Sequence, residues 1–111
     1  MKKITPREAY QLAGELALDL HRSIRCTPGS QDYELAMELR HTAQDTAMNL
    51  SPDVEREDGI DAACGSVARL EYGLILARDL GLFPKAGVQE FQERAADLGR
   101  RLQKMNSKLR A

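Results

Sequence analysis

Tryptophan is missing from the sequence, and aromatic residues as a whole make up only 5% of its 111 residues. A hydrophobic core must therefore be built from aliphatic side chains and alanine. Long apolar runs are also missing, since none approaches the roughly 18 residues of a membrane-spanning helix. No apolar segment of a signal peptide follows Lys2 and Lys3, because Pro6, Arg7 and Glu8 interrupt it. We therefore expect a cytoplasmic protein without a membrane segment.

Cysteine is scarce, and its placement argues against a metal site. Cys26 and Cys64 belong to no Cys-x-x-Cys pair, and neither has a histidine within four residues. This spacing does not support zinc binding, and a disulfide is not expected in a reducing compartment. We expect both residues to pack as small apolar side chains.

A strong excess of charge of either sign is absent as well. The chain has 16 Lys and Arg against 17 Asp and Glu, which excludes a strongly basic nucleic-acid binder of the histone kind. A content of 42% hydrophobic and 30% charged residues is typical of a folded domain rather than a disordered chain. The length favours one domain spanning residues 1–111.

What the sequence does contain is helical periodicity in four segments, with no stretch of strand-like alternation. The first begins at a capping box, Thr5-Pro6-Arg7-Glu8, in which Thr5 and Glu8 each accept a hydrogen bond from the other's backbone N–H. Residues 27–29 are expected to end it. Its expected apolar stripe is Tyr10, Ala13, Ala17, Leu20 and Ile24, with Leu12 and Leu16 beside it.

The second and third segments are predicted with less regular boundaries. The second begins at Ser30 and stops at Ser51-Pro52, and acidic residues 52–58 form a loop or frayed turn. The third runs from about Asp58 to Leu80 and ends at Gly81. The second stripe is Ala36, Leu39, Ala43, Ala47 and Leu50, and the third is Ile60, Ala63, Val67, Leu70, Leu74 and Ala77.

The fourth segment starts near Pro84 or Lys85 and carries the clearest pattern, with apolar residues at alternating steps of three and four. Four helices with short connections predict an all-α fold, an antiparallel up-down-up-down four-helix bundle. The fourth stripe is Val88, Phe91, Ala95, Leu98, Leu102, Met105 and Leu109.

The third segment has more apolar residues than one core needs. Beyond its stripe it carries Ala68, Tyr72, Ile75 and Leu76, so it is apolar on nearly all sides, as buried helices are. We expect these four residues to form a homo-oligomer interface. The alternative is a scatter of exposed apolar residues, which is common on protein surfaces. Gly65-Ser66 in the same segment predicts close approach of a neighbouring backbone.

Two charged residues lie beside the predicted core. Arg40 follows Leu39, and Glu71 follows Leu70. Because unpaired charges near a core are unfavourable, we expect a buried ion pair between Arg40 and Glu71. The alternative is that each side chain reaches solvent separately.

Signs of catalysis are few. Glu38 and His41 have the Glu-x-x-His spacing of di-iron bundles, and Asp45 lies four residues further on. There is only one such motif, however, and His41 points away from the Leu39–Ala43 stripe. No nucleophile elbow or phosphate-binding loop is present. We expect no enzyme, no metal and no cofactor, and keep a metal-dependent activity at His41 as the least favoured alternative.

Charge is distributed unevenly along the chain. Residues 28–84 carry 11 acidic and four basic side chains, whereas residues 85–111 carry seven basic and three acidic ones. One interpretation is a phosphate-binding ridge for nucleic acid, although aromatic interleaving is lacking. The other is pairing with the acidic middle of the chain. The cations concerned are Arg94, Arg100, Arg101, Lys104, Lys108 and Arg110.

The runs 38–43, 49–50, 64–71 and 74–82 resemble the four-helix bundle proteins encoded in intervening sequences of 23S ribosomal RNA genes and their stand-alone bacterial relatives. The resemblance is most specific from Gly65 to Gly81, and Arg40, Ser66 and Glu71 match family positions. It implies a bacterial cytosolic protein and a ring-like homopentamer. A more distant relative, the accessory variability determinant of diversity-generating retroelements, is a basic pentamer that binds nucleic acid and a reverse transcriptase.

The chain departs from this pattern at residues 51–58, where members often have Ala-Glu-Gly followed by basic and serine residues. The acidic segment here, and the lack of overall basic charge, weigh against nucleic-acid binding. Our first hypothesis is a non-enzymatic oligomeric scaffold or adaptor that binds itself and an unidentified protein. The alternative is a nucleic-acid-binding accessory protein that uses the cations of residues 94–110.

Overall fold

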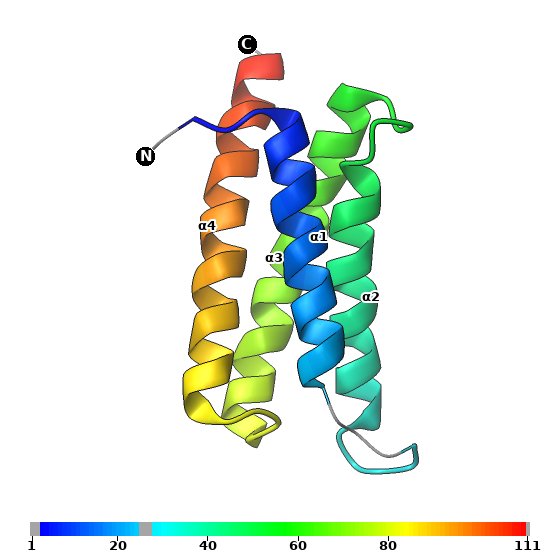
Figure 1. The fold of residues 1–111 in the computed structure, drawn as a ribbon, viewed down its shortest axis with the longest axis vertical. Coiled ribbons are helices and arrows are strands. Elements are labelled where there is room, and N and C mark those ends of the chain that lie inside the picture. The colour runs from blue at the N-terminus through cyan, green and yellow to red at the C-terminus, as the bar shows by residue number, and fades with distance from the viewer. Residues whose placement is uncertain (1–2, 25–27, 111) are drawn as a thin grey trace.

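The computed structural model describes residues 3–24 and 28–110, and within these it contains four α-helices. They are α1 (Pro6–Ser23), α2 (Tyr33–Asn49), α3 (Arg56–Leu80) and α4 (Lys85–Arg110). The helices run antiparallel to their sequence neighbours and form an elongated bundle of 44 × 27 × 19 Å (Figure 1). The predicted all-α four-helix bundle is confirmed.

Each helix packs against the next one in the chain, and α1 closes the bundle against α4 through the least extensive of these contacts. The core is aliphatic, as the composition predicts. The two phenylalanines are its aromatic members, with ring centroids of Phe83 and Phe91 5.7 Å apart. Leu20, Leu39, Leu70, Leu74 and Leu102 are fully buried.

The start of α1 follows the predicted capping box. The Glu8 amide donates to Thr5 Oγ1 at 3.1 Å, and the Thr5 amide donates to Glu8 Oε1 at 3.3 Å. The end of α1 differs from the prediction, since the helix stops at Ser23 and Ile24 caps it. Cys26 and Thr27 lie outside the described residues. The inward stripe begins at the buried Ala9, whereas Tyr10 lies on the adjacent, exposed side.

The helices α2 and α3 begin away from the predicted positions. Helix α2 starts at Tyr33 rather than Ser30, because residues 28–32 form turns. Helix α3 starts two residues before Asp58, because Glu55 caps it. The Glu55 carboxylate accepts hydrogen bonds from the amides of Glu57 (3.1 Å) and Asp58 (2.8 Å), which satisfies two N–H groups of the first turn.

Two glycines fix the ends of α3. Gly81 has φ +71°, a left-handed conformation that favours glycine, and it ends the helix as predicted. Gly59 is buried where α3 leaves its first turn, and a Cβ there would overlap the backbone oxygen of Asn49. Glycine at this position therefore lets the start of α3 lie against the end of α2.

The apolar stripe of α4 is buried from Val88 to Leu102 and then emerges from the core. Met105 is half-buried and Leu109 is 40% exposed. The cause is the longer reach of α4, which extends past the first turn of α1 (Figure 1). The last turns of α4 therefore extend beyond α1 and have fewer helices beside them than the rest of α4.

Candidate functional site

Helix α3 exposes apolar side chains on the side that faces away from the core. We call Ala68, Tyr72, Ile75 and Leu76 the α3 face. Tyr72 is 63% exposed, Ile75 39% and Leu76 36%, whereas Leu70 and Leu74 on the opposite side are fully buried. The four residues predicted as an oligomer interface thus share one solvent-exposed face of the single chain.

Gly65 lies two turns before Tyr72. Nothing lies within 4 Å of a Cβ built on it, so no neighbouring backbone of the same chain approaches it closely. Its neighbour Ser66 is buried, and the Oγ of Ser66 donates to the Ala62 backbone oxygen at 3.2 Å. The expected close approach at Gly65-Ser66 is therefore not found within one chain, and Gly65 remains open on the exposed side of α3.

A second apolar surface, which the sequence did not predict, lies between α1 and α2. Tyr10, Leu18, Met48 and Val54 line a shallow groove of about 580 Å³ and are each 37–57% exposed. We call these residues the α1/α2 groove. Sequence reasoning placed Tyr10 on the core stripe and passed over Leu18 and Met48, because each is a single apolar residue beside a regular stripe.

The predicted ion pair between Arg40 and Glu71 is wrong for the described structure. Arg40 Nη2 donates to the backbone oxygens of Ile24 (2.9 Å) and His21 (3.4 Å) at the end of α1. The physical reason is helix geometry, since Arg40 lies on the α1 side of α2 and Glu71 on the α4 side of α3. Within the described residues Arg40 Nε has no hydrogen-bond partner.

Glu71 lies over α4, where a Cβ added to Gly99 would be 3.4 Å from Glu71 Oε2. Burial raises the pKa of the Glu71 carboxyl, and the positive charge of Arg100 opposes this effect. The half-buried Glu71 carboxyl thus lacks the close ion pair expected from the sequence, and the charge of Arg100 offsets only part of the effect of burial.

Most of the predicted α4 cations pair with carboxylates. Arg94 Nη1 lies 2.9 Å from Asp19 on α1, and its guanidinium lies over the Phe91 ring at 5.9 Å. Asp97 pairs with Arg101 at 3.0 Å and with Arg100 at 3.7 Å. These ion pairs within the protein offset part of the positive charge that a phosphate-binding ridge on α4 would need.

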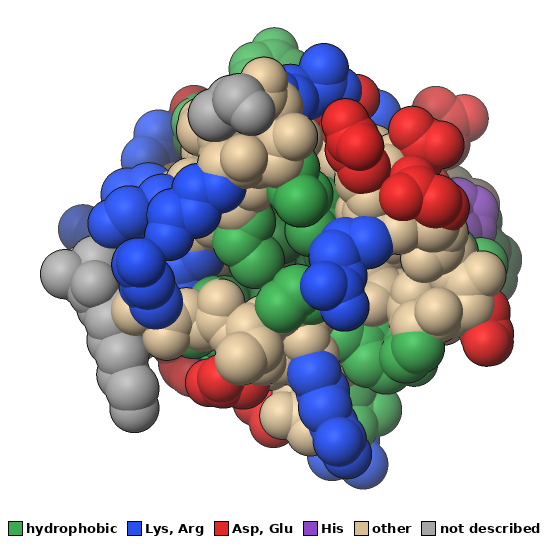
Figure 2. All heavy atoms as spheres, turned by 90° about the horizontal axis from the view of Figure 1, so that it is seen from above, with side chains coloured by type: hydrophobic (Ala, Val, Ile, Leu, Met, Phe, Trp, Pro, Cys, Tyr) green, Lys and Arg blue, Asp and Glu red, His purple; other side chains and the backbone are tan. Residues whose placement is uncertain are grey.

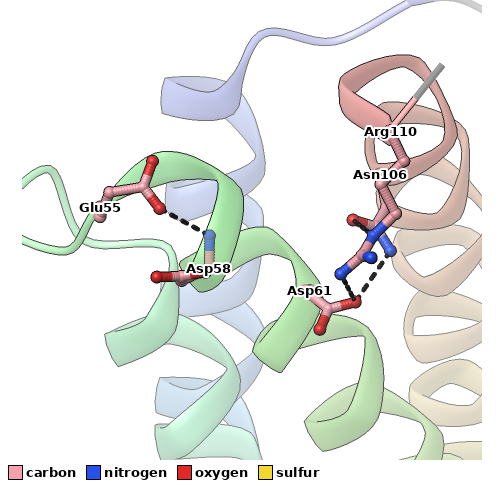
Figure 3. Close-up of polar contacts among 5 residues, drawn as sticks. All are labelled: Glu55, Asp58, Asp61, Asn106 and Arg110. Atoms are coloured by element: carbon pink, nitrogen blue, oxygen red, sulfur yellow. Dashed lines mark hydrogen bonds and ion pairs between the residues drawn. The ribbon is translucent and has the colours of Figure 1, made fainter.

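Arg110 joins the end of α4 to the start of α3 (Figure 3). Arg110 Nη2 lies 2.9 Å from Asp61 Oδ1, and Asn106 Nδ2 donates to the same oxygen at 3.1 Å. Arg110 Nε also donates to Asn106 Oδ1 at 3.3 Å, which closes a three-residue cluster. Arg110 therefore pairs with the acidic middle of the chain as expected, whereas the partners of the other three arginines, Asp19 and Asp97, lie outside that segment.

Lys104 and Lys108 differ from the other α4 cations. Both are exposed, and no ion pair joins either of them to a carboxylate of the described residues. They lie at the end of the bundle where residues 3–6, the start of α3 and the end of α4 meet.

The Glu38–His41 spacing places both side chains on the exposed surface of α2. Glu38, His41 and Asp45 are all exposed on α2, and the part of the chain that the structure describes contains no group of three or more His, Cys, Asp and Glu able to hold a metal ion. Cys64 is a free, buried thiol whose pKa is raised by burial. Its environment is that of the packing residue expected from the sequence.

Comparisons with known proteins found no match to any family model, any curated protein or any solved structure. Among the described residues, no helix has both the length and the apolar character needed to cross a membrane.

Proposed function

We propose that the protein is a non-enzymatic homo-oligomeric scaffold or adaptor, whose copies pack through the α3 face. The observation that carries this proposal is the exposure of Tyr72, Ile75 and Leu76 on one side of a helix whose other side is core. Contiguous exposed apolar surface marks interaction sites more often than isolated apolar residues do. Gly65 adds room for a second copy to approach the same side of α3.

We take the α1/α2 groove, the second exposed apolar surface, as the surface that the α3 face binds on the next copy. The two surfaces share no residue and lie on different helices. A surface that binds a different surface of the next copy produces a closed ring or a filament, whereas a self-complementary surface produces a dimer. We favour the ring, in line with the homopentamer that the family resemblance implies.

Single substitutions that introduce a charge test whether the α3 face is an interface. Ile75→Glu is expected to sediment as a 12.4 kDa monomer with unchanged helicity, because a carboxylate would be buried in the interface. Leu12→Glu is the matched control, since Leu12 is 38% exposed on α1 and belongs to neither surface. It should assemble like the wild type. Equal assembly of Ile75→Glu and the wild type would contradict the proposal.

A mixing experiment tests the head-to-tail arrangement. Met48→Glu impairs the α1/α2 groove and keeps the α3 face, and Ile75→Glu does the reverse. Each variant alone is expected to be monomeric, and an equimolar mixture is expected to form a heterodimer through the one intact pair of surfaces. A stable dimer of Met48→Glu alone would instead show that the α3 face binds itself.

Nucleic-acid binding through α4 is the alternative function. Lys104 and Lys108 favour it, because described carboxylates do not pair with them, but the pairing of Arg94, Arg100, Arg101 and Arg110 disfavours a ridge along the helix. Replacing Arg94, Arg101 and Lys108 together by Gln should abolish salt-dependent RNA or DNA binding and leave assembly intact. Under the scaffold proposal no such binding is expected in the wild type.

A further inference from the structure

The bundle is open at the end where α3 begins and α4 finishes. A cavity of about 220 Å³ lies there, and we call it the end cavity. Figure 2 looks down on this end and shows apolar side chains at its centre, with Lys and Arg side chains on several sides of them and Asp and Glu side chains at the upper right. The cavity exists because the apolar stripe of α4 continues through Met105 and Leu109 beyond the first turn of α1.

The described residues that line the end cavity are of two kinds. The apolar wall comes from four parts of the fold: the segment before α1, the first turn of α1, α3 and α4. It consists of Ile4, Pro6, Ile60, Met105 and Leu109. The remaining lining residues are all cations, namely Lys3, Arg56, Arg101, Lys104 and Lys108. No carboxylate is among the described residues that line it.

This concentration of positive charge is unusual for a chain whose net charge is -1. Asp97 offsets part of it through its pair with Arg101, at 3.0 Å. No carboxylate of the described residues forms such a pair with Lys108. The adjacent Lys3 side chain, and then the charge of Lys104, lower the pKa of Lys108, as expected where ammonium groups crowd together. An anion placed among these groups would relieve their repulsion.

We propose that the end cavity binds a small amphipathic organic anion, with its acidic headgroup at Lys104 and Lys108 and its apolar part against Met105 and Leu109. Apolar pockets with a few convergent polar groups are the usual form of a small-molecule site. A cavity of about 150 Å³ accommodates benzene in other proteins, so this volume has room for an apolar part of roughly six to eight carbon atoms. The headgroup is a carboxylate, sulfate or phosphate.

The α1/α2 groove is the natural comparison within the molecule. It is larger and also apolar, but neither Lys nor Arg is among the described residues that line it. An uncharged apolar ligand is therefore expected to bind in the α1/α2 groove, whereas an amphipathic anion is expected to bind in the end cavity. The site lies apart from the α3 face, so this proposal and the scaffold proposal stand or fall separately.

Calorimetric titration of the full chain at low salt tests the proposal with octanoate, octanol and inorganic phosphate. We expect saturable octanoate binding that weakens as salt rises, and at least about tenfold weaker binding of octanol and of phosphate. Lys104→Gln combined with Lys108→Gln should weaken octanoate binding about tenfold. The control, Arg78→Gln with Lys85→Gln, removes the same charge at the opposite end of the bundle and should bind octanoate as the wild type does.

Methyl spectra of methionine-labelled protein locate the site. Octanoate should shift the Met105 methyl signal and leave those of Met37 and Met48 unchanged, because Met48 lies in the α1/α2 groove. The proposal is overturned by absence of saturable binding, by octanol binding as tightly as octanoate, by equal loss in the control variant, or by a shift at Met48 rather than Met105.

Discussion

Arg40 of α2 donates a hydrogen bond of 2.9 Å to the backbone oxygen of Ile24, the residue that caps α1. The last carbonyl groups of a helix have no partner within the helix and carry partial negative charge. A guanidinium from the next helix therefore satisfies the end of α1 and ties it to α2, although residues 25–27 of the connection lie outside the described structure.

Arg40→Met is expected to destabilise the fold by about 1 to 2 kcal/mol, at the lower end for charged hydrogen bonds, because Arg40 Nε is itself without a described partner. Urea unfolding at neutral pH measures the change. Arg78→Met, at an exposed position whose guanidinium contacts the neighbouring Asp79, should stay within about 0.5 kcal/mol of the wild type. Equal stability of the Arg40 variant and the wild type would show that the α1 carbonyls do not need this donor.

Glycine-to-alanine substitutions at two helix positions should have opposite effects. Gly59→Ala places a methyl group against the Asn49 backbone and is expected to destabilise by about 1 to 3 kcal/mol. Gly14→Ala meets nothing within 4 Å on α1 and should stabilise by about 0.5 to 1 kcal/mol. Thermal unfolding compares the two variants. Stabilisation by Gly59→Ala would mean that α2 and α3 do not lie as close as described.

The raised pKa of Glu71 predicts how stability depends on pH. Folding raises the pKa of this carboxyl, so the folded state binds its proton more tightly and loses stability as pH rises through the unfolded and then the folded pKa. Glu71→Gln removes the titration. The variant should therefore be more stable than the wild type at neutral pH, with a difference that disappears in acid, as acid-to-neutral unfolding series measure. A variant less stable than the wild type at pH 7 would indicate a favourable partner for the carboxylate.

Glu55 predicts the opposite dependence. Hydrogen bonds from the Asp58 and Glu57 amides lower the pKa of its carboxyl, so its contribution is present above the unfolded pKa and is lost as pH falls through the folded pKa. Glu55→Gln should fray the start of α3 at neutral pH, seen as faster amide exchange in residues 56–60. In acid the variant and the wild type should exchange alike. Unchanged exchange at neutral pH would remove Glu55 as the cap.

Periodicity predicted much of the fold and less of the sites. The stripes of α2, α3 and α4 identified the core, because spacing alone fixes which side of a helix an apolar residue occupies. The capping box of α1 could also be predicted, since its two partners, Thr5 and Glu8, are only three residues apart in the sequence. The Glu55 cap was missed because its acidic neighbours at 53–58 resemble a loop in composition.

Contacts between helices were beyond the sequence pattern. The sequence placed Arg40 next to the core residue Leu39. The hydrogen-bond partner of Arg40, however, depends on which helix packs against that side of α2, and this helix is α1. The sequence did not predict the end cavity for a similar reason. Lys3, Arg56 and Lys108 are far apart in the chain and line one cavity only because α4 extends beyond the first turn of α1. The additional apolar residues of the α3 face could be predicted from the sequence because they all lie on one helix.

In the proposed scaffold, a second copy of the chain covers Tyr72, Ile75 and Leu76. Sedimentation equilibrium of the wild-type chain at micromolar concentration measures it most directly. We expect a mass that is a whole multiple of 12.4 kDa, which is five copies for a pentameric ring. A single species of 12.4 kDa across the concentration range would contradict it.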